Sequence, residues 1–134
     1  MKKSTFKLLP LSLLLAGLVF ATVSCKKEVK TPDRDKFLAT YSVAQDCSGQ
    51  TNTYDMTIAV SAVSDNAVTI YNLFKLGKTL EATVSGDNIT IASQVVSSVT
   101  YSGSGSISGN ILTLNFTIAN GAASISCTAV CTKQ

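Results

Sequence analysis

From Phe37 to the end of the chain, apolar and polar residues alternate with a period of two. Clusters of Gly, Asn, Asp and Ser interrupt this alternation at regular intervals. Such alternation is typical of strands that bury one face, and the interruptions are typical of tight turns. No interruption leaves room for a crossover helix, so consecutive strands are expected to pair antiparallel. The pattern predicts eight strands, at residues 37–44, 53–62, 67–74, 79–85, 88–95, 98–108, 110–119 and 123–132.

Eight short strands in sequence predict one all-β domain over residues 37–134. A meander of this kind removes its two unpaired edges when the last strand pairs with the first, which closes the sheet into a barrel. We therefore expect an eight-stranded antiparallel barrel, with a two-sheet β-sandwich as the alternative.

Barrel closure makes a prediction about the three cysteines of the domain. Closure brings the end of the first strand, just before Cys47, beside the beginning of the last strand, where Cys127 lies. Cys131 lies four residues further along, or about 13 Å in a strand, whereas bridged cysteines have Cα atoms within about 7 Å. The predicted disulfide is Cys47–Cys127, and Cys131 is predicted to be a free, buried thiol.

The first 24 residues have a different pattern, that of a secretory signal peptide. Three lysines within the first seven residues are followed by an uncharged, mostly apolar run over residues 8–23. This run is shorter than the roughly 20 residues of a transmembrane helix, and small residues follow it. We expect residues 1–24 to be removed on export, and an exported chain is a setting in which disulfides form.

Residues 22–25, Thr-Val-Ser-Cys, resemble the lipobox of bacterial lipoproteins, although Thr22 stands where an aliphatic residue is usual. In that motif the cysteine is acylated, with palmitate among the chains, and becomes the new N-terminus. The alternative is ordinary cleavage after Ser24, which leaves Cys25 unlipidated. Residues 25–36 are charged and poor in apolar residues, which is typical of a flexible tether. We expect acyl chains on Cys25 to anchor the protein to a membrane.

Removal of the signal peptide also changes the charge of the protein. The full chain has 11 basic and 8 acidic residues, for a net charge of +3. Residues 1–24 contain three of the lysines and no acid, so the mature chain is neutral. Nucleic-acid binding requires a cationic surface, and no nucleic-acid partner is therefore expected.

The strand and turn sequences include Tyr54-Asp55-Met56-Thr57-Ile58, Val68-Thr69-Ile70-Tyr71-Asn72, Gly103-Ser104-Gly105-Ser106-Ile107-Ser108-Gly109-Asn110, Leu112-Thr113-Leu114 and Cys127-Thr128-Ala129. Through these segments, nearly all of residues 37–134 resembles small lipoproteins of the Bacteroidetes, and the Ser24-Cys25-Lys26-Lys27-Glu28 start is also similar. These proteins are described as lipocalin-like β-barrels, and most have no assigned activity. The resemblance implies the same fold and a place in the cell envelope, at a periplasmic or surface face of the outer membrane. The chain has no Trp and so lacks the Gly-x-Trp signature of the lipocalins proper.

Residues suited to catalysis are scarce. The chain has no histidine, which removes Ser–His and Cys–His nucleophile pairs and the commonest transition-metal ligand. Asp55 and Glu81 are the acids well inside predicted strands, and alternation places both on the outward face. We therefore expect a protein that is not an enzyme and has no cofactor or metal.

Four polar side chains are the candidates for ligand binding inside the barrel: Tyr41, Tyr54, Asn72 and Tyr101. Alternation places all four on the inward face, where a hydroxyl or amide can bond the polar end of a ligand. The alternative for the tyrosines is an aromatic core whose hydroxyls bond to the protein. The alternative for Asn72 is that its amide satisfies loop backbone groups where the strand ends.

Two glycines, Gly103 and Gly105, also lie on the inward face. They either open a small cavity or permit a sharp bend. A cavity would favour a carrier of a small apolar ligand. A filled interior would favour the alternative, a non-catalytic surface lipoprotein that binds a protein partner and has a structural, adhesive or inhibitory role.

Overall fold

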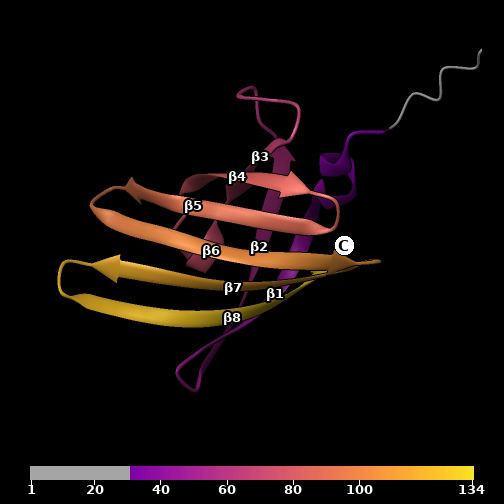
Figure 1. Ribbon diagram of the computed structural model, residues 1–134. Coiled ribbons are helices and arrows are strands. Elements are labelled where there is room, and N and C mark those ends of the chain that lie inside the picture. The colour runs from indigo at the N-terminus through magenta and orange to yellow at the C-terminus, as the bar shows by residue number, and fades with distance from the viewer. Residues whose placement is uncertain (1–30) are drawn as a thin grey trace, which may run out of the picture.

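The computed structural model describes residues 31–134, and the predicted signal peptide and Cys25 lie outside the described residues. The chain forms a closed eight-stranded antiparallel barrel, which confirms the predicted fold over the sandwich alternative (Figure 1). No helix in this part of the chain is long and apolar enough to cross a membrane. The elements are η1 (Asp33–Phe37), β1 (Ala39–Cys47), β2 (Gln50–Val60), β3 (Ala67–Tyr71), η2 (Leu73–Lys75), β4 (Thr79–Ser85), β5 (Asn88–Val96), β6 (Val99–Ser108), β7 (Ile111–Asn120) and β8 (Ala123–Lys133).

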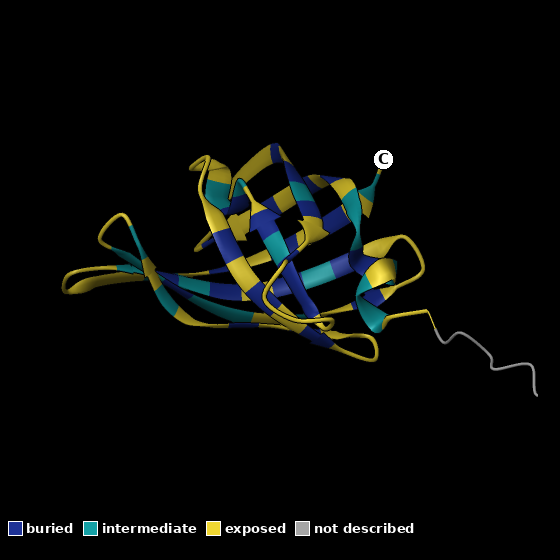
Figure 2. Ribbon diagram, turned by 90° about the horizontal axis from the view of Figure 1, so that it is seen from above, coloured by how far each residue is buried: buried dark blue, intermediate teal, exposed yellow. Residues whose placement is uncertain are grey.

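Every strand pairs with its neighbour in sequence, and β8 closes the barrel against β1. The closing ladder runs from the pair Tyr41 and Lys133 to the pair Cys47 and Cys127. Along the strands buried and exposed residues alternate, as the blue and yellow bands of Figure 2 show. The buried residues form a single apolar core inside the barrel.

The first strand begins later and ends later than the predicted range 37–44. Phe37 belongs to the short 3-10 helix η1, and β1 continues through Cys47. Phe37 is fully buried in the core, so η1 closes one end of the barrel. The last residues of the predicted tether, 25–36, are therefore part of the folded structure.

Polar contacts hold η1 against the turn between β4 and β5. The Gly86 amide donates to Asp33 Oδ2 at 2.9 Å, and the Lys36 ammonium pairs with Asp87 at 2.7 Å. Lys133, at the end of β8, donates to the Lys36 carbonyl at 2.6 Å. The entering and leaving ends of the described chain thus lie together at the η1 end (Figure 2).

At the opposite end, which we call the mouth, the hairpins β5–β6 and β7–β8 extend beyond the barrel (Figures 1 and 2). Residues 123–126 of β8 have no partner on β1. On the other side, the β4–β5 ladder ends at the pair Thr83 and Thr90, and beyond it β5 shifts its register against β6 between Ile91 and Gln94. The Gln94 amide bridges the gap, because it accepts from the Glu81 amide at 3.0 Å and donates to the Glu81 carbonyl at 2.7 Å. A side chain thus replaces one step of the backbone ladder.

Candidate functional site

The three candidate tyrosines do not converge on one cavity. The Tyr41 hydroxyl donates to the Phe37 carbonyl at 2.7 Å, close to η1. The Tyr54 hydroxyl donates to Gln45 Oε1 at 2.6 Å, near the mouth. Burial raises the pKa of each of the three tyrosines, and that of Tyr54 to about 12. Tyr101, on β6, is buried in the core. The hydroxyls of Tyr41 and Tyr54 therefore bond to protein groups.

Asn72 does not face the barrel interior, contrary to the prediction from alternation. The strand β3 ends at Tyr71, and Asn72 adopts a left-handed backbone conformation with φ of 70°. Its side chain donates to the Asp55 carbonyl at 2.8 Å and accepts from the Gly77 amide at 2.8 Å. Asn72 thus satisfies backbone groups of the β3–β4 loop, as asparagine commonly does where φ is positive.

The inward glycines permit close approach between β6 and β7. A Cβ atom on Gly103 would lie 2.6 Å from the Asn115 carbonyl oxygen and 2.6 Å from Phe116 Cβ. A Cβ atom on Gly105 would lie 2.7 Å from Leu114 Cδ2 and would also overlap the Thr113 carbonyl. The space beside these glycines is filled by β7, so they shape the wall instead of opening a cavity.

Gly105→Ala is expected to lower the free energy of unfolding by about 2 kcal/mol, because an added methyl group in a filled core forces the backbone to shift. The measurement is urea unfolding followed by circular dichroism. Ser104→Ala, an outward-facing change on the same strand, is the control and is expected to change stability by about 0.5 kcal/mol or less. Equal stability of Gly105→Ala and the native chain would contradict this role.

The cysteines form the predicted arrangement within residues 31–134. Cys47 and Cys127 are directly opposite each other on β1 and β8 and are joined by a disulfide, with Cα atoms 4.2 Å apart. Cys131 is free and buried. Burial raises the pKa of its thiol to about 12, so the thiol stays protonated near neutral pH and is a poor nucleophile.

A polar network that the sequence analysis missed lies just inside the mouth. Gln45 is only 3% exposed, and its amide nitrogen lies 3.1 Å from Cys47 Sγ. The Tyr54 hydroxyl donates to Gln45 and accepts from the Phe74 amide at 3.0 Å. Gln45 continues the inward alternation of Tyr41 and Val43, but the predicted strand ended at residue 44.

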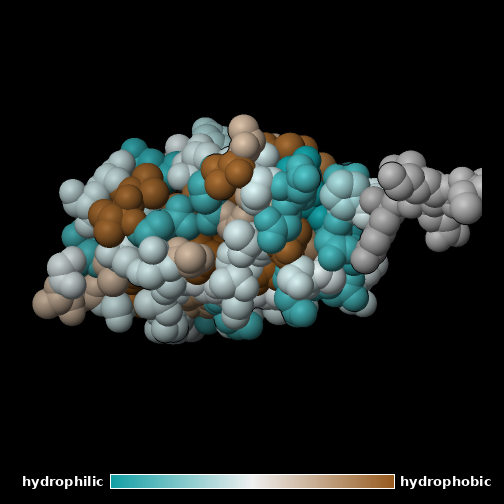
Figure 3. Space-filling model, turned by 45° about the horizontal axis from the view of Figure 1, so that its top comes forward, coloured by the Kyte–Doolittle hydropathy of each residue, from teal (hydrophilic) through white to brown (hydrophobic). Residues whose placement is uncertain are grey.

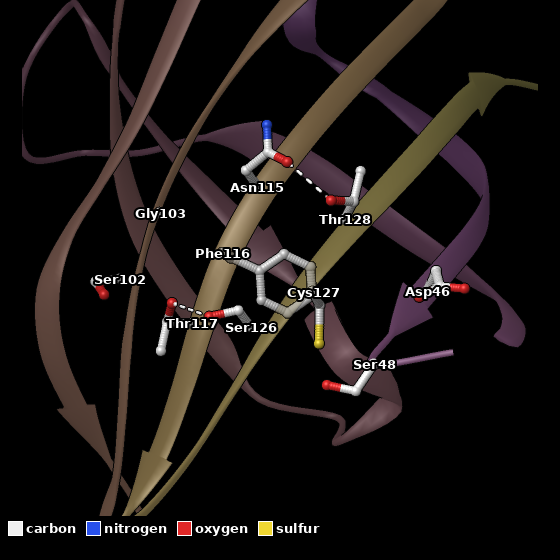
Figure 4. Close-up of a pocket in the computed structure, with 10 residues that line it drawn as sticks. All are labelled: Asp46, Ser48, Ser102, Gly103, Asn115, Phe116, Thr117, Ser126, Cys127 and Thr128. Carbon is white, nitrogen blue, oxygen red and sulfur yellow. Dashed lines mark hydrogen bonds between the residues drawn. The ribbon is translucent and has the colours of Figure 1, made fainter. Parts of the chain in front are cut away.

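A groove of about 350 Å³ lies on the outer wall, where small side chains of β6, β7 and β8 face the β1–β2 turn (Figure 4). Hydroxyl, amide and carboxylate groups dominate its lining, and we call it the hydroxyl groove. Asn115 accepts from the Thr128 hydroxyl at 2.9 Å, and the hydroxyls of Thr117 and Ser126 lie 3.2 Å apart. Its lining residues are Asp46, Ser48, Ser102, Gly103, Asn115, Phe116, Thr117, Ser126, Cys127 and Thr128.

The wall that contains most of this groove carries no charge. Between Asp87 and Lys133 the sequence has no Asp, Glu, Lys or Arg, so strands β5 to β7 and nearly all of β8 are uncharged. Asp46, from β1, supplies a carboxylate at the border of the groove. Pale and brown residues accordingly cover much of the left part of Figure 3, whereas teal residues gather toward the right.

Comparison with known proteins supports the fold. No protein-family model matches the chain, and no curated protein matches it. A redesigned β-barrel superposes with a TM-score of 0.56 at 14% identity, covering 78% of this chain and 97% of the design. A crystal structure of a "putative outer membrane protein" from Bacteroides fragilis superposes with a TM-score of 0.51 at 18% identity, covering 78% of this chain and 53% of that one. This chain therefore spans about half of the Bacteroides protein, and its superposition on the redesigned barrel agrees with the β-barrel fold.

Proposed function

We propose that the protein is a lipid-anchored, non-catalytic recognition protein of the cell envelope, and that it binds a neutral saccharide in the hydroxyl groove. The observation that carries the proposal is this polar groove on an uncharged wall.

The anchoring part of the proposal rests on the N-terminal sequence and on the docking of η1. Residues 1–24 have the signal-peptide pattern, and Cys25 ends a lipobox-like motif. Seven residues lie between Cys25 and Asp33. The eight steps from one Cα atom to the other span at most about 29 Å in an extended chain. Acyl chains on Cys25 would hold the η1 end near the bilayer. The name of the Bacteroides fragilis neighbour agrees with an envelope location.

The saccharide part rests on the chemistry of the groove. Sugar hydroxyls donate and accept hydrogen bonds, and the groove offers serine and threonine hydroxyls, the Asn115 amide and the Asp46 carboxylate. The amide nitrogen of Asn115 has no recorded partner among residues 31–134 and is available to a ligand oxygen. A volume of about 350 Å³ lies within the usual range of about 300–1,000 Å³ for small-molecule sites.

The packing of the barrel interior supports the alternative, a small apolar ligand inside the barrel, less than the groove supports a saccharide. Two of the tyrosines and both glycines that were expected to line such a cavity contact protein groups. Asn72 bonds to loop backbone.

Cys25→Ser tests the anchor. The variant is expected to leave the membrane fraction, because the serine hydroxyl cannot take the place of the acylated thiol. Cell fractionation with immunodetection measures the change, and Cys131→Ser serves as the control because Cys131 is buried inside the barrel. Unchanged membrane association of Cys25→Ser would overturn the lipid anchor.

Affinity electrophoresis in gels that contain neutral or anionic polysaccharides tests the groove. The native protein is expected to be retarded by a neutral polysaccharide, and Thr117→Lys, which fills the groove, is expected to lose the retardation. Ser106→Lys places the same charge on the outward face of β6, outside the groove, and should keep it. The saccharide proposal would be overturned if the two variants were retarded equally. It would also be overturned if no neutral polysaccharide retarded the native protein.

A further inference from the structure

A second and smaller cleft lies at the mouth, away from the hydroxyl groove. It has a volume of about 250 Å³ and is bounded by Gln45, Asn52, Tyr54, Phe74 and Lys75. This is the volume of about eight water molecules in the liquid. The cleft is therefore large enough for a small organic molecule.

The amide of Gln45 has a hydrogen-bond donor to spare in this cleft. A glutamine side chain carries two N–H donors and one carbonyl acceptor. The acceptor of Gln45 is used by the Tyr54 hydroxyl. The recorded partner of its nitrogen within residues 31–134 is the disulfide sulfur of Cys47, and sulfur is a weak acceptor. A 97% buried side chain thus offers an N–H group that lacks a strong partner.

Asn52 lies on the same face as Gln45, because the two residues are directly opposite in the β1–β2 ladder. Asn52 is exposed at the rim of the cleft. Its side-chain amide adds further N–H donors near that of Gln45.

The loop around η2 brings a cation to the same cleft. Asn72, Phe74 and Lys75 have φ values of 70°, 62° and 57°, a conformation that non-glycine residues rarely adopt. The Tyr54 hydroxyl holds the Phe74 amide, and the Phe74 ring packs edge-on against Phe116. Strained backbone that the surrounding structure fixes in place is common at ligand sites. Here the strain sets Phe74 and Lys75 at the border of the cleft.

Lys75 is free to meet an anion. The ion pair recorded within residues 31–134 joins Lys36 to Asp87, at the η1 end of the barrel. Asp46 follows Gln45 on β1, but its side chain lies on the outer wall and accepts a hydrogen bond from the Gly49 amide. The cleft is therefore lined by donors and one ammonium group, with no carboxylate among its lining residues.

We propose that this cleft binds a small organic carboxylate. The carboxylate oxygens accept hydrogen bonds from the amides of Gln45 and Asn52 and pair with the Lys75 ammonium, while the carbon chain of the ligand lies against the Phe74 ring. Tyr54 is a positioning residue, because its hydroxyl orients Gln45 and holds Phe74 in place.

Titration with butyrate and with butyramide, its uncharged analogue of similar shape, tests the proposal on the mature chain. Nitrogen–proton correlation spectra report the side-chain amide signals of Gln45 and Asn52. Butyrate is expected to shift both signals saturably, and butyramide is expected to bind at least fivefold more weakly. The carboxylate site would be overturned if neither compound shifted the two signals. It would also be overturned if butyrate and butyramide bound with equal affinity.

Two lysines of the same loop supply a matched pair of variants. Lys75→Gln is expected to raise the Kd for butyrate at least fivefold at low ionic strength, because it removes the ammonium at the cleft. Lys78→Gln removes the same charge three residues away, outside the lining, and should change the Kd less than twofold. Equal effects of the two variants would mean that net charge alone attracts the anion, and would overturn the site. Both lysines are exposed, so neither change is expected to affect folding.

Discussion

Cys47→Ala is expected to lower the free energy of unfolding by about 4 kcal/mol, since the lost bridge closes a loop of 80 residues in sequence. The bridge connects the first strand to the last, where the barrel closes. Without it the unfolded chain gains conformational freedom, and the β1–β8 ladder must hold by hydrogen bonds and packing alone. Urea unfolding of the two proteins measures the difference.

The other cysteines provide the controls. Cys127→Ala is expected to cost as much as Cys47→Ala, and the double variant little more, because both changes remove the same bond. Cys131→Ala removes one buried sulfur atom and is expected to cost about 1–2 kcal/mol as a core truncation. Additive losses in the double variant would contradict a shared disulfide.

Phe37→Ala is expected to lower the free energy of unfolding by about 3–5 kcal/mol, which is the usual cost of truncating a buried phenylalanine. Phe37 is fully buried and closes the barrel from η1. Its loss should also release η1, because the remaining contacts of η1 are polar and partly exposed. Urea unfolding measures the stability, and limited trypsin digestion at Arg34 and Lys36 measures the release.

Leu38→Ala is the control for that experiment, since Leu38 is only partly buried beside the same core. It is expected to cost less stability and to leave trypsin resistance nearly unchanged. Equal trypsin sensitivity in the two variants would show that Phe37 is not the residue that docks η1.

The alternation of side chains predicted the fold because its period is that of a strand with one buried face. Gly86, Gly109 and Gly121 lie in turns with positive φ, as the hairpin assignments required. The disulfide followed from topology: once the last strand is placed beside the first, Cys127 is the cysteine within reach of Cys47. These predictions depended on local pattern and on strand order.

The remaining features depend on where strands end and bend, which the pattern does not reveal. Asn72 continues the alternation of Val68 and Ile70, yet β3 stops one residue before it. Gln45 is a polar residue on the inward face. Its side-chain carbonyl accepts a hydrogen bond from Tyr54, which lies on the neighbouring strand β2. The hydroxyl groove combines residues of four strands and the β1–β2 turn. Its lining cannot be predicted from one strand at a time.

Closure of β1 by β8 also sets the order of events during folding. The partner that completes β1 is the last strand of the chain, so β1 keeps one open edge until residues 127–133 have arrived. Long-range pairing of this kind slows folding. The disulfide between Cys47 and Cys127 likewise forms only after Cys127 has been synthesised, when an oxidant outside the protein takes up the two electrons that the thiols lose. Cys131 follows Cys127 in the chain. A chain truncated before β8 would leave both β1 and β7 with unpaired backbone, which is a template for aggregation. The barrel is therefore completed as a unit, once β8 is in place beside β1.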